Sequence, residues 1–128
     1  MIPLIYVAHP FGGEKHLLDD AERWVAKLSL HFDAIFWAPG IPLCRNWPDS
    51  GESRARGLEI DMQAVDRSDG VLMVGGYVSS GMTMERDRAN RVLDMVHLCD
   101  PVDLCCSQCP PWQKVERWIG NLAKCVNK

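Results

Sequence analysis

The chain has 128 residues, of which 47% are hydrophobic and 24% are charged. These proportions fit one globular domain with its own hydrophobic core, so we expect a single domain over residues 1–128. A formal net charge of −3 without any basic run excludes the usual nucleic-acid-binding surface, which needs clustered lysine and arginine side chains.

The chain begins with a β-rich run. Residues Ile2–Ala8 read IPLIYVA and are followed by the turn-like segment HPFGG. This start lacks a positively charged leader, and its apolar stretch is too short to span a membrane. We therefore interpret it as a first strand, and we expect a cytoplasmic protein with no membrane partner.

Three segments have the spacing of amphipathic helices. In residues 17–28, 58–65 and 115–126, apolar side chains recur at steps of three and four residues, with charged or polar residues between them. Such a pattern predicts one face turned to a core and one turned to water.

Short apolar runs between these helices predict further strands, at residues 34–38, 71–74 and 95–98. The segment Ile41–Ser53 is rich in Pro, Asn, Asp, Gly and Ser, so we expect an irregular lid or rim over a ligand site.

The stretch from Gly70 to Asn90, GVLMVGGYVSSGMTMERDRAN, organises this pattern. Its continuous apolar run fits a strand buried on both faces, the small residues fit a turn, and the segment with Glu85 near its beginning fits a helix. Strand and helix alternate through nearly the whole chain. We therefore predict an α/β fold, with a doubly wound, Rossmann- or flavodoxin-like parallel sheet of four to five strands flanked by helices.

Familiar nucleotide motifs are missing from the sequence. It has neither the Gly-x-x-x-x-Gly-Lys-Ser/Thr loop nor a Gly-x-Gly-x-x-Gly segment after the first strand, which disfavours nucleoside-triphosphate hydrolysis and nicotinamide chemistry.

Four of the six cysteines fall between Cys99 and Cys109, just after His97. Their spacing lacks two separated Cys-x-x-Cys pairs, so we predict reduced thiols and no metal, with a zinc or thiol module as an alternative.

Two carboxylates are the candidates for chemistry. Glu85 follows the central strand and Asp61 lies on the preceding helix, and two acids brought together supply a nucleophile and a proton donor, as glycosidic chemistry requires. Each also has a structural interpretation. An acid near a helix start is favoured by the helix dipole, and Asp61 could lie on a solvated face.

The joint order of the motifs resembles the nucleoside 2-deoxyribosyltransferase superfamily, which includes the 2′-deoxynucleoside 5′-monophosphate N-glycosidases and related uncharacterised phage-type proteins. The resemblance covers roughly the first hundred residues. It rests on Ile5–Ala8 with Gly12-Gly13, Asp61 before Ser68-Asp69, and Ser79–Glu85 with Ala89.

This resemblance implies roles for individual residues. Glu85 would attack the anomeric carbon, Asp61 would protonate or orient the leaving base, and Tyr6 would lie near the sugar. Ser79 falls where the transferases carry an aspartate that binds a free 5′-hydroxyl, and where the monophosphate glycosidases carry a serine. A hydroxyl there tolerates a phosphate that a carboxylate would repel.

The phosphate-binding set implied by the resemblance continues around that serine and in the first loop. It comprises Ser79, Ser80 and Gly81, together with Gly12 and His9, where His9 takes over from an arginine of the family. The resemblance also implies a homodimer or higher homo-oligomer, in which a neighbouring subunit completes the site.

We therefore expect hydrolysis of the N-glycosidic bond of a (deoxy)nucleoside 5′-monophosphate through a glycosyl-enzyme intermediate, with no metal or organic cofactor. Two alternatives stay open. One is base exchange by a nucleoside 2-deoxyribosyltransferase, and the other is a module that binds or senses a nucleotide without turnover.

Overall fold

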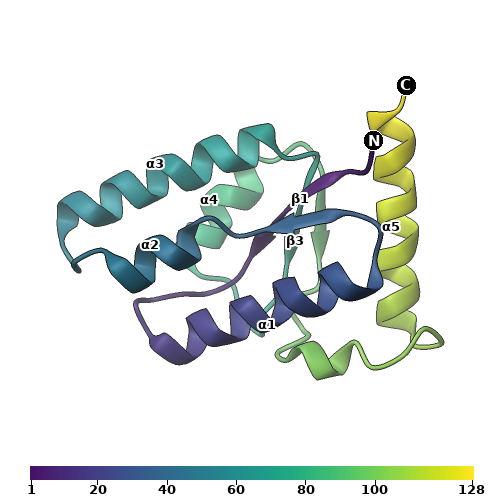
Figure 1. The fold of residues 1–128 in the computed structure, drawn as a ribbon, viewed down its shortest axis with the longest axis horizontal. Helices are drawn as coiled ribbons and strands as arrows, with labels where there is room; N and C mark the ends of the chain where they lie inside the picture. Colours follow the sequence, from purple (N-terminus) through teal and green to yellow (C-terminus); the bar gives the residue numbers. More distant parts are fainter.

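The computed structural model describes residues 1–128 and contains a four-stranded parallel sheet with helices on both faces (Figure 1). The sheet order is β2-β1-β3-β4, and every neighbouring pair is parallel. The predicted α/β fold is confirmed. The strands are β1 (Leu4–Ala8), β2 (Ile35–Trp37), β3 (Gly70–Met73) and β4 (Val92–Asp94).

Five α-helices and one short 3₁₀ turn surround the sheet. They are α1 (Lys15–His31), α2 (Gly40–Asn46), α3 (Gly51–Arg67), α4 (Ser80–Arg88), the 3₁₀ turn η1 (Pro101–Asp103) and α5 (Pro110–Val126). The helices predicted around residues 17–28, 58–65 and 115–126 are present. Helices α1 and α3 extend further at both ends, and α5 begins earlier, at Pro110. None of the helices combines the length and hydrophobicity needed to span a membrane.

The sheet separates two hydrophobic clusters, because side chains alternate along each strand. One cluster joins α1 and α5 to the sheet, with Trp24, Leu28 and Ile119 among its buried members. The other joins α3 and α4 to the opposite face through Val65 and Met82. The two central strands are therefore covered on both faces, which explains the uninterrupted apolar sequences of β1 and β3.

The fourth strand was predicted at the wrong place. Residues Met95–Leu98 form a turn, and the strand is the preceding segment Val92–Asp94, which pairs with β3. This strand lies at the edge of the sheet and has only three residues, one of them the exposed Asp94. Met95 and Leu98 are nevertheless buried, because the turn packs their side chains into the core.

The irregular lid predicted at Ile41–Ser53 is also wrong. Most of this segment is helical, because α2 covers Gly40–Asn46 and α3 begins at Gly51 after its cap, Ser50. Pro42 lies in the first turn of α2, where its missing N–H costs no helical hydrogen bond. Only a four-residue connection separates the two helices.

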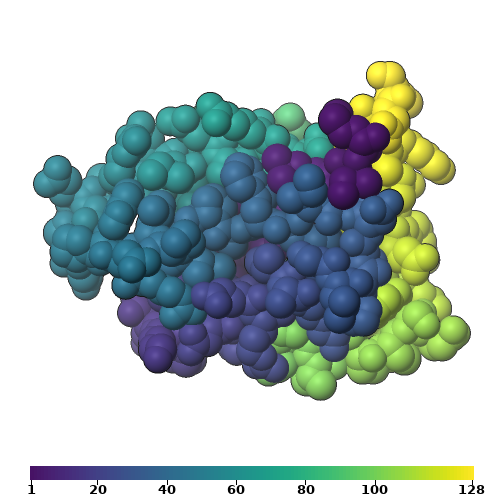
Figure 2. All heavy atoms as spheres, viewed as in Figure 1, coloured from purple at the N-terminus to yellow at the C-terminus, as the bar shows by residue number.

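The two chain ends lie side by side. Figure 2 shows the first residues against the C-terminal helix, and the amino group of Met1 donates to Asn127 Oδ1 over 3.2 Å. At the same end of the sheet, Asp69 accepts a hydrogen bond of 2.7 Å from the backbone of Leu4. Asp69 therefore ties the starts of β1 and β3 together, at the edge opposite the strands' carboxyl ends.

Candidate functional site

The connection between β3 and α4 is set by glycine and serine. Gly75 has a φ of +105°, and a Cβ there would lie 2.7 Å from the His9 ring. Only glycine fits so close to the loop that follows β1. Ser79 then caps α4, because its Oγ accepts a hydrogen bond of 3.2 Å from the backbone of Met82. This turn fixes where the side chains of α4 point.

Glu85 projects from α4 toward the sheet and is 7% exposed. It lies one helical turn after Gly81, and its Oε1 is 3.9 Å from the place a Cβ of Gly81 would occupy. Glu85 Oε2 is buried without a hydrogen-bond partner. A buried carboxylate oxygen without a partner is costly, so Glu85 is poorly explained as a structural residue.

Asp61 reaches the same region from α3. Its Oδ1 is buried without a partner, and its carboxylate approaches Gly40 at the start of α2, where a Cβ would lie 3.2 Å from Oδ1. The aromatic ring of Phe11 also borders Gly40. Asp61 is thus enclosed between α2 and α3 and does not lie on a solvated helix face.

Tyr6 connects the two acids. It is the third residue of β1, it is 1% exposed, and it faces α3 and α4 in the cluster with Ala64 and Met82. Its hydroxyl is close enough to the carboxyls of Asp61 and Glu85 to lower the pKa of both. The structure therefore brings Tyr6, Asp61 and Glu85 together, although they come from three different elements. We call this trio the acidic site.

Burial dominates the electrostatics of the acidic site. It is the main cause that raises the pKa of Glu85 to about 8. The Tyr6 hydroxyl lowers this pKa in part, and the charge of Asp61 raises it further. Burial raises the pKa of Asp61 to about 6, again partly offset by Tyr6. The pKa of Tyr6 itself rises well above its ordinary value, through burial and the two nearby carboxyls. At neutral pH the two acids therefore share one proton.

The predicted phosphate-binding residues divide into two groups. Ser79 uses its Oγ as the helix cap, while the backbone N–H groups of Ser80 and Gly81 make no hydrogen bond within the protein. Free N–H groups at a helix start favour an anion. They lie in the same first turn of α4 that Glu85 Oε1 approaches, so an anion here would be next to the acidic site.

His9 lies in the loop after β1, against Gly75, and is only 3% exposed. Its Nδ1 is 2.7 Å from the carbonyl oxygen of Pro10, which makes Nδ1 the donor in the neutral ring, and burial lowers the pKa of His9. The remaining Nε2 is then an acceptor, which does not favour phosphate binding by His9. Gly12, exposed and with a φ of +54°, shapes the β1–α1 loop.

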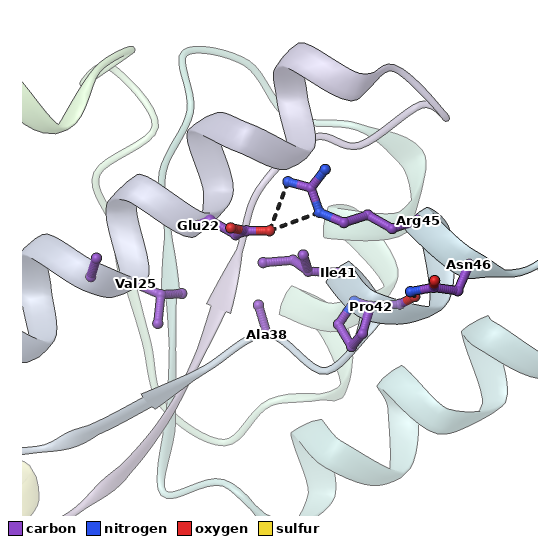
Figure 3. A pocket seen from close by; sticks show the side chains of 8 residues that line it. Glu22, Val25, Ala38, Ile41, Pro42, Arg45 and Asn46 are labelled. Carbon is purple, nitrogen blue, oxygen red and sulfur yellow. Dashed lines mark hydrogen bonds and ion pairs between the residues drawn. The ribbon is translucent and has the colours of Figure 1, made fainter.

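A separate cavity of about 460 Å³ opens between α1 and α2. Figure 3 shows Ile41 pointing into it and the Arg45 side chain reaching Glu22 across its rim, a contact of 2.7 Å. None of the three residues of the acidic site lines this cavity. Only the short helix α2 is common to both, because Ile41 faces the cavity and Gly40 touches Asp61.

Two residues of α2 at the acidic site carry no sequence signal. Gly40 makes room for the Asp61 carboxylate, and burial, with a smaller contribution from the charge of Asp61, raises the pKa of the Cys44 thiol. Both depend on how α2 packs against α3, which spacing alone does not reveal. The one group of three or more His, Cys, Asp or Glu side chains close enough to share an ion is Cys105, Cys106 and Cys109.

Comparison with known proteins gives a family but no activity. Residues 3–98, which include the whole acidic site, match the family described as a domain of unknown function (DUF7768). No curated protein matches the chain. The match ends before the cysteine-rich loop and α5.

Proposed function

We propose that this chain, which belongs to the DUF7768 family, hydrolyses the N-glycosidic bond of a (deoxy)nucleoside 5′-monophosphate and releases the free base and a sugar phosphate. The observation that carries the proposal is the convergence of Glu85 and Asp61 on Tyr6 in a buried site. Two acids that share one proton at neutral pH form the apparatus of a two-step glycosidase, with one carboxylate to attack and one carboxylic acid to protonate.

In the first step, an ionised Glu85 oxygen attacks the anomeric carbon C1′. The bond between C1′ and the base nitrogen breaks, and its electron pair leaves with the base, which takes a proton from Asp61. In the second step, a water molecule loses a proton to the Asp61 carboxylate and attacks C1′, the ester bond to Glu85 breaks, and Glu85 returns as a carboxylate.

The proton that the two acids share in the free protein must move from Glu85 to Asp61 before Glu85 can attack. In the free protein the higher pKa of Glu85 leaves the shared proton on Glu85, whereas attack requires it on Asp61. Tyr6 interacts with both carboxyls, so its hydroxyl can pass the proton from Glu85 to Asp61 as substrate binds. Tyr6 thus acts as a relay and orients both acids.

Two features support a phosphorylated substrate. The N–H groups of Ser80 and Gly81 are free to bind an anion beside Glu85, and residue 79 is a serine, which adds no negative charge there. Asp61 Oδ1 and Glu85 Oε2 are buried acceptors without partners, and sugar hydroxyls are suitable donors for them.

The test is a panel of ribo- and deoxyribonucleoside monophosphates and the matching nucleosides, with free base measured by chromatography. We expect base release from at least one monophosphate, at a higher rate than from its nucleoside. New nucleoside formed only when a second free base is added would identify base exchange instead. Thermal stabilisation by monophosphates without any base released would identify a binding module.

A further inference from the structure

Three cysteines gather in the loop before α5. Cys105 Sγ lies 2.9 Å from Cys109 Sγ, and Cys106 Sγ lies 3.1 Å from the same atom, so Cys109 is at the centre of the group. The three sulfurs all lie within 4.8 Å of one another, and none forms a disulfide. We call Cys105, Cys106 and Cys109 the cysteine trio.

The loop that carries the trio is held at both ends. Leu104, immediately before it, is completely buried, and Cys109 is the residue that caps α5. The backbone N–H of Cys109 donates to the carbonyl of Cys106 over 3.1 Å, which closes a tight turn between them. The sulfurs are therefore brought together by backbone that is anchored in the core.

The chemistry of the trio suits a soft metal ion. Cysteine thiolates are among the ligands that zinc prefers in proteins, and three cysteine side chains here are within reach of one ion. In a tetrahedral zinc site with Zn–S bonds of about 2.3 Å, neighbouring sulfurs are roughly 3.8 Å apart. The exposed loop needs only a small outward movement of the side chains to reach that spacing.

We propose that Cys105, Cys106 and Cys109 bind one zinc ion through three thiolates, with the fourth position open to water or an added ligand. The trio lies outside residues 3–98, so this site is a property of the segment that follows the family match. It shares no residue with the acidic site, and its test is independent of the glycosidase proposal.

The experiment uses the reduced, chelator-treated full chain, titrated with zinc against a chromophoric chelator and with cobalt by absorption spectroscopy. We expect one ion per chain and a near-ultraviolet thiolate-to-cobalt band. Each of Cys105→Ser, Cys106→Ser and Cys109→Ser should weaken zinc binding at least 10-fold. Serine is a good helix cap, so Cys109→Ser keeps the start of α5 intact and its circular dichroism should be unchanged.

Matched controls come from the same chain. Cys99 lies in the same region but outside the trio, and its Sγ contacts Asp103 at 3.8 Å, while Cys125 lies near the end of α5. Cys99→Ser and Cys125→Ser should bind zinc as the wild type does. Zinc binding that is undetectable, or that survives replacement of all three cysteines of the trio, would overturn the proposal. So would a disulfide in the trio whose reduction leaves zinc unbound.

Discussion

Helices α3 and α4 carry two pairs of ionisable side chains, and the pKa values of their carboxyl groups shift in opposite directions. On the outer side, Arg88 binds Asp66 with two hydrogen bonds of 2.6 and 2.7 Å, and this pairing lowers the pKa of Asp66. On the inner side, neither Asp61 nor Glu85 forms an ion pair with a cation, and burial raises both pKa values.

The outer pair is compatible with a stable fold, whereas the inner pair costs stability and is suited to catalysis. The outer pair satisfies both charges in water, whereas the inner pair places two acids where their ionisation is unfavourable and leaves two oxygens without partners. A fold gains nothing in stability from such an arrangement, but pKa values near neutrality are what acid and base catalysis require. The predictions that follow change one pair at a time.

Asp61→Asn should strongly reduce base release. An amide cannot protonate the leaving base, so base release should fall about 10²- to 10⁴-fold. The loss should be much smaller for a monophosphate with an N7-methylated purine, because that base leaves without being protonated. Single-turnover rates of base release on the two substrates, which report the first step without the later attack of water, check this. An equal loss on both would contradict a role for Asp61 as the acid.

Glu85→Gln should stabilise the fold at high pH. The pKa of Glu85 is raised from 4.5 to about 8, so the folded state binds more protons than the unfolded state between these values. The free energy of unfolding therefore falls as pH rises through that window. Glutamine removes the effect, so the variant should gain on the order of 5 kcal/mol relative to wild type between pH 4 and pH 9.

Urea unfolding of both proteins at the two pH values measures this difference. The control is Glu59→Gln, an exposed carboxylate on α3 that pairs only with Arg56. That variant should show no comparable gain. A Glu85→Gln variant whose stability relative to wild type does not change with pH would show that Glu85 ionises normally.

Tyr6→Phe should shift the pH dependence of activity. The Tyr6 hydroxyl lowers the pKa of both acids, so its removal should raise both values and move the two limbs of the profile to higher pH. Loss of the relay should reduce the maximal rate about 10-fold. The rate measured from pH 5 to pH 9 tests this. An unchanged profile would remove Tyr6 from the acidic site's chemistry.

Arg88→Gln should have the smallest effect. The Arg88–Asp66 pair is about half exposed, so water and salt screen the interaction and its contribution to stability is small. A double-mutant cycle with Asp66→Asn, measured in low and high salt, should give a small coupling energy that salt reduces. Base release should stay at the wild-type rate. A large loss of activity would contradict the separation between the two pairs.

The central part of the fold could be predicted from the sequence because its signals are local. Strands β1 and β3 are apolar throughout, and the helix containing Trp24 has a clear apolar stripe. The edge strand β4 was misplaced because Val92–Asp94 is short and partly exposed, while the next four residues are more apolar. Helix α2 was missed because Pro42 and its polar neighbours suggest a loop.

The acidic site was predictable only in part. Residue types and order suggested Glu85, Asp61 and Tyr6, but their convergence depends on the packing of α3 and α4 on one face of the sheet. The close approach of Asp61 to Gly40 and its electrostatic influence on Cys44 depend on the packing of α2 against α3 and have no local signature. His9 shows the opposite case. The sequence suggests a phosphate ligand at this position, but in the fold the ring is buried and its Nδ1 donates a hydrogen bond to the backbone carbonyl of Pro10.

The most direct test of the account compares base release by the wild type, Glu85→Gln and Asp66→Asn on the same nucleoside monophosphate at neutral pH. Asp66→Asn alters the outer pair of the same two helices and serves as the matched control. We predict at least a roughly 10³-fold loss for Glu85→Gln, with its fold intact by circular dichroism, and near-normal release by Asp66→Asn. Base release by Glu85→Gln at the wild-type rate would contradict the assignment of Glu85 as the nucleophile.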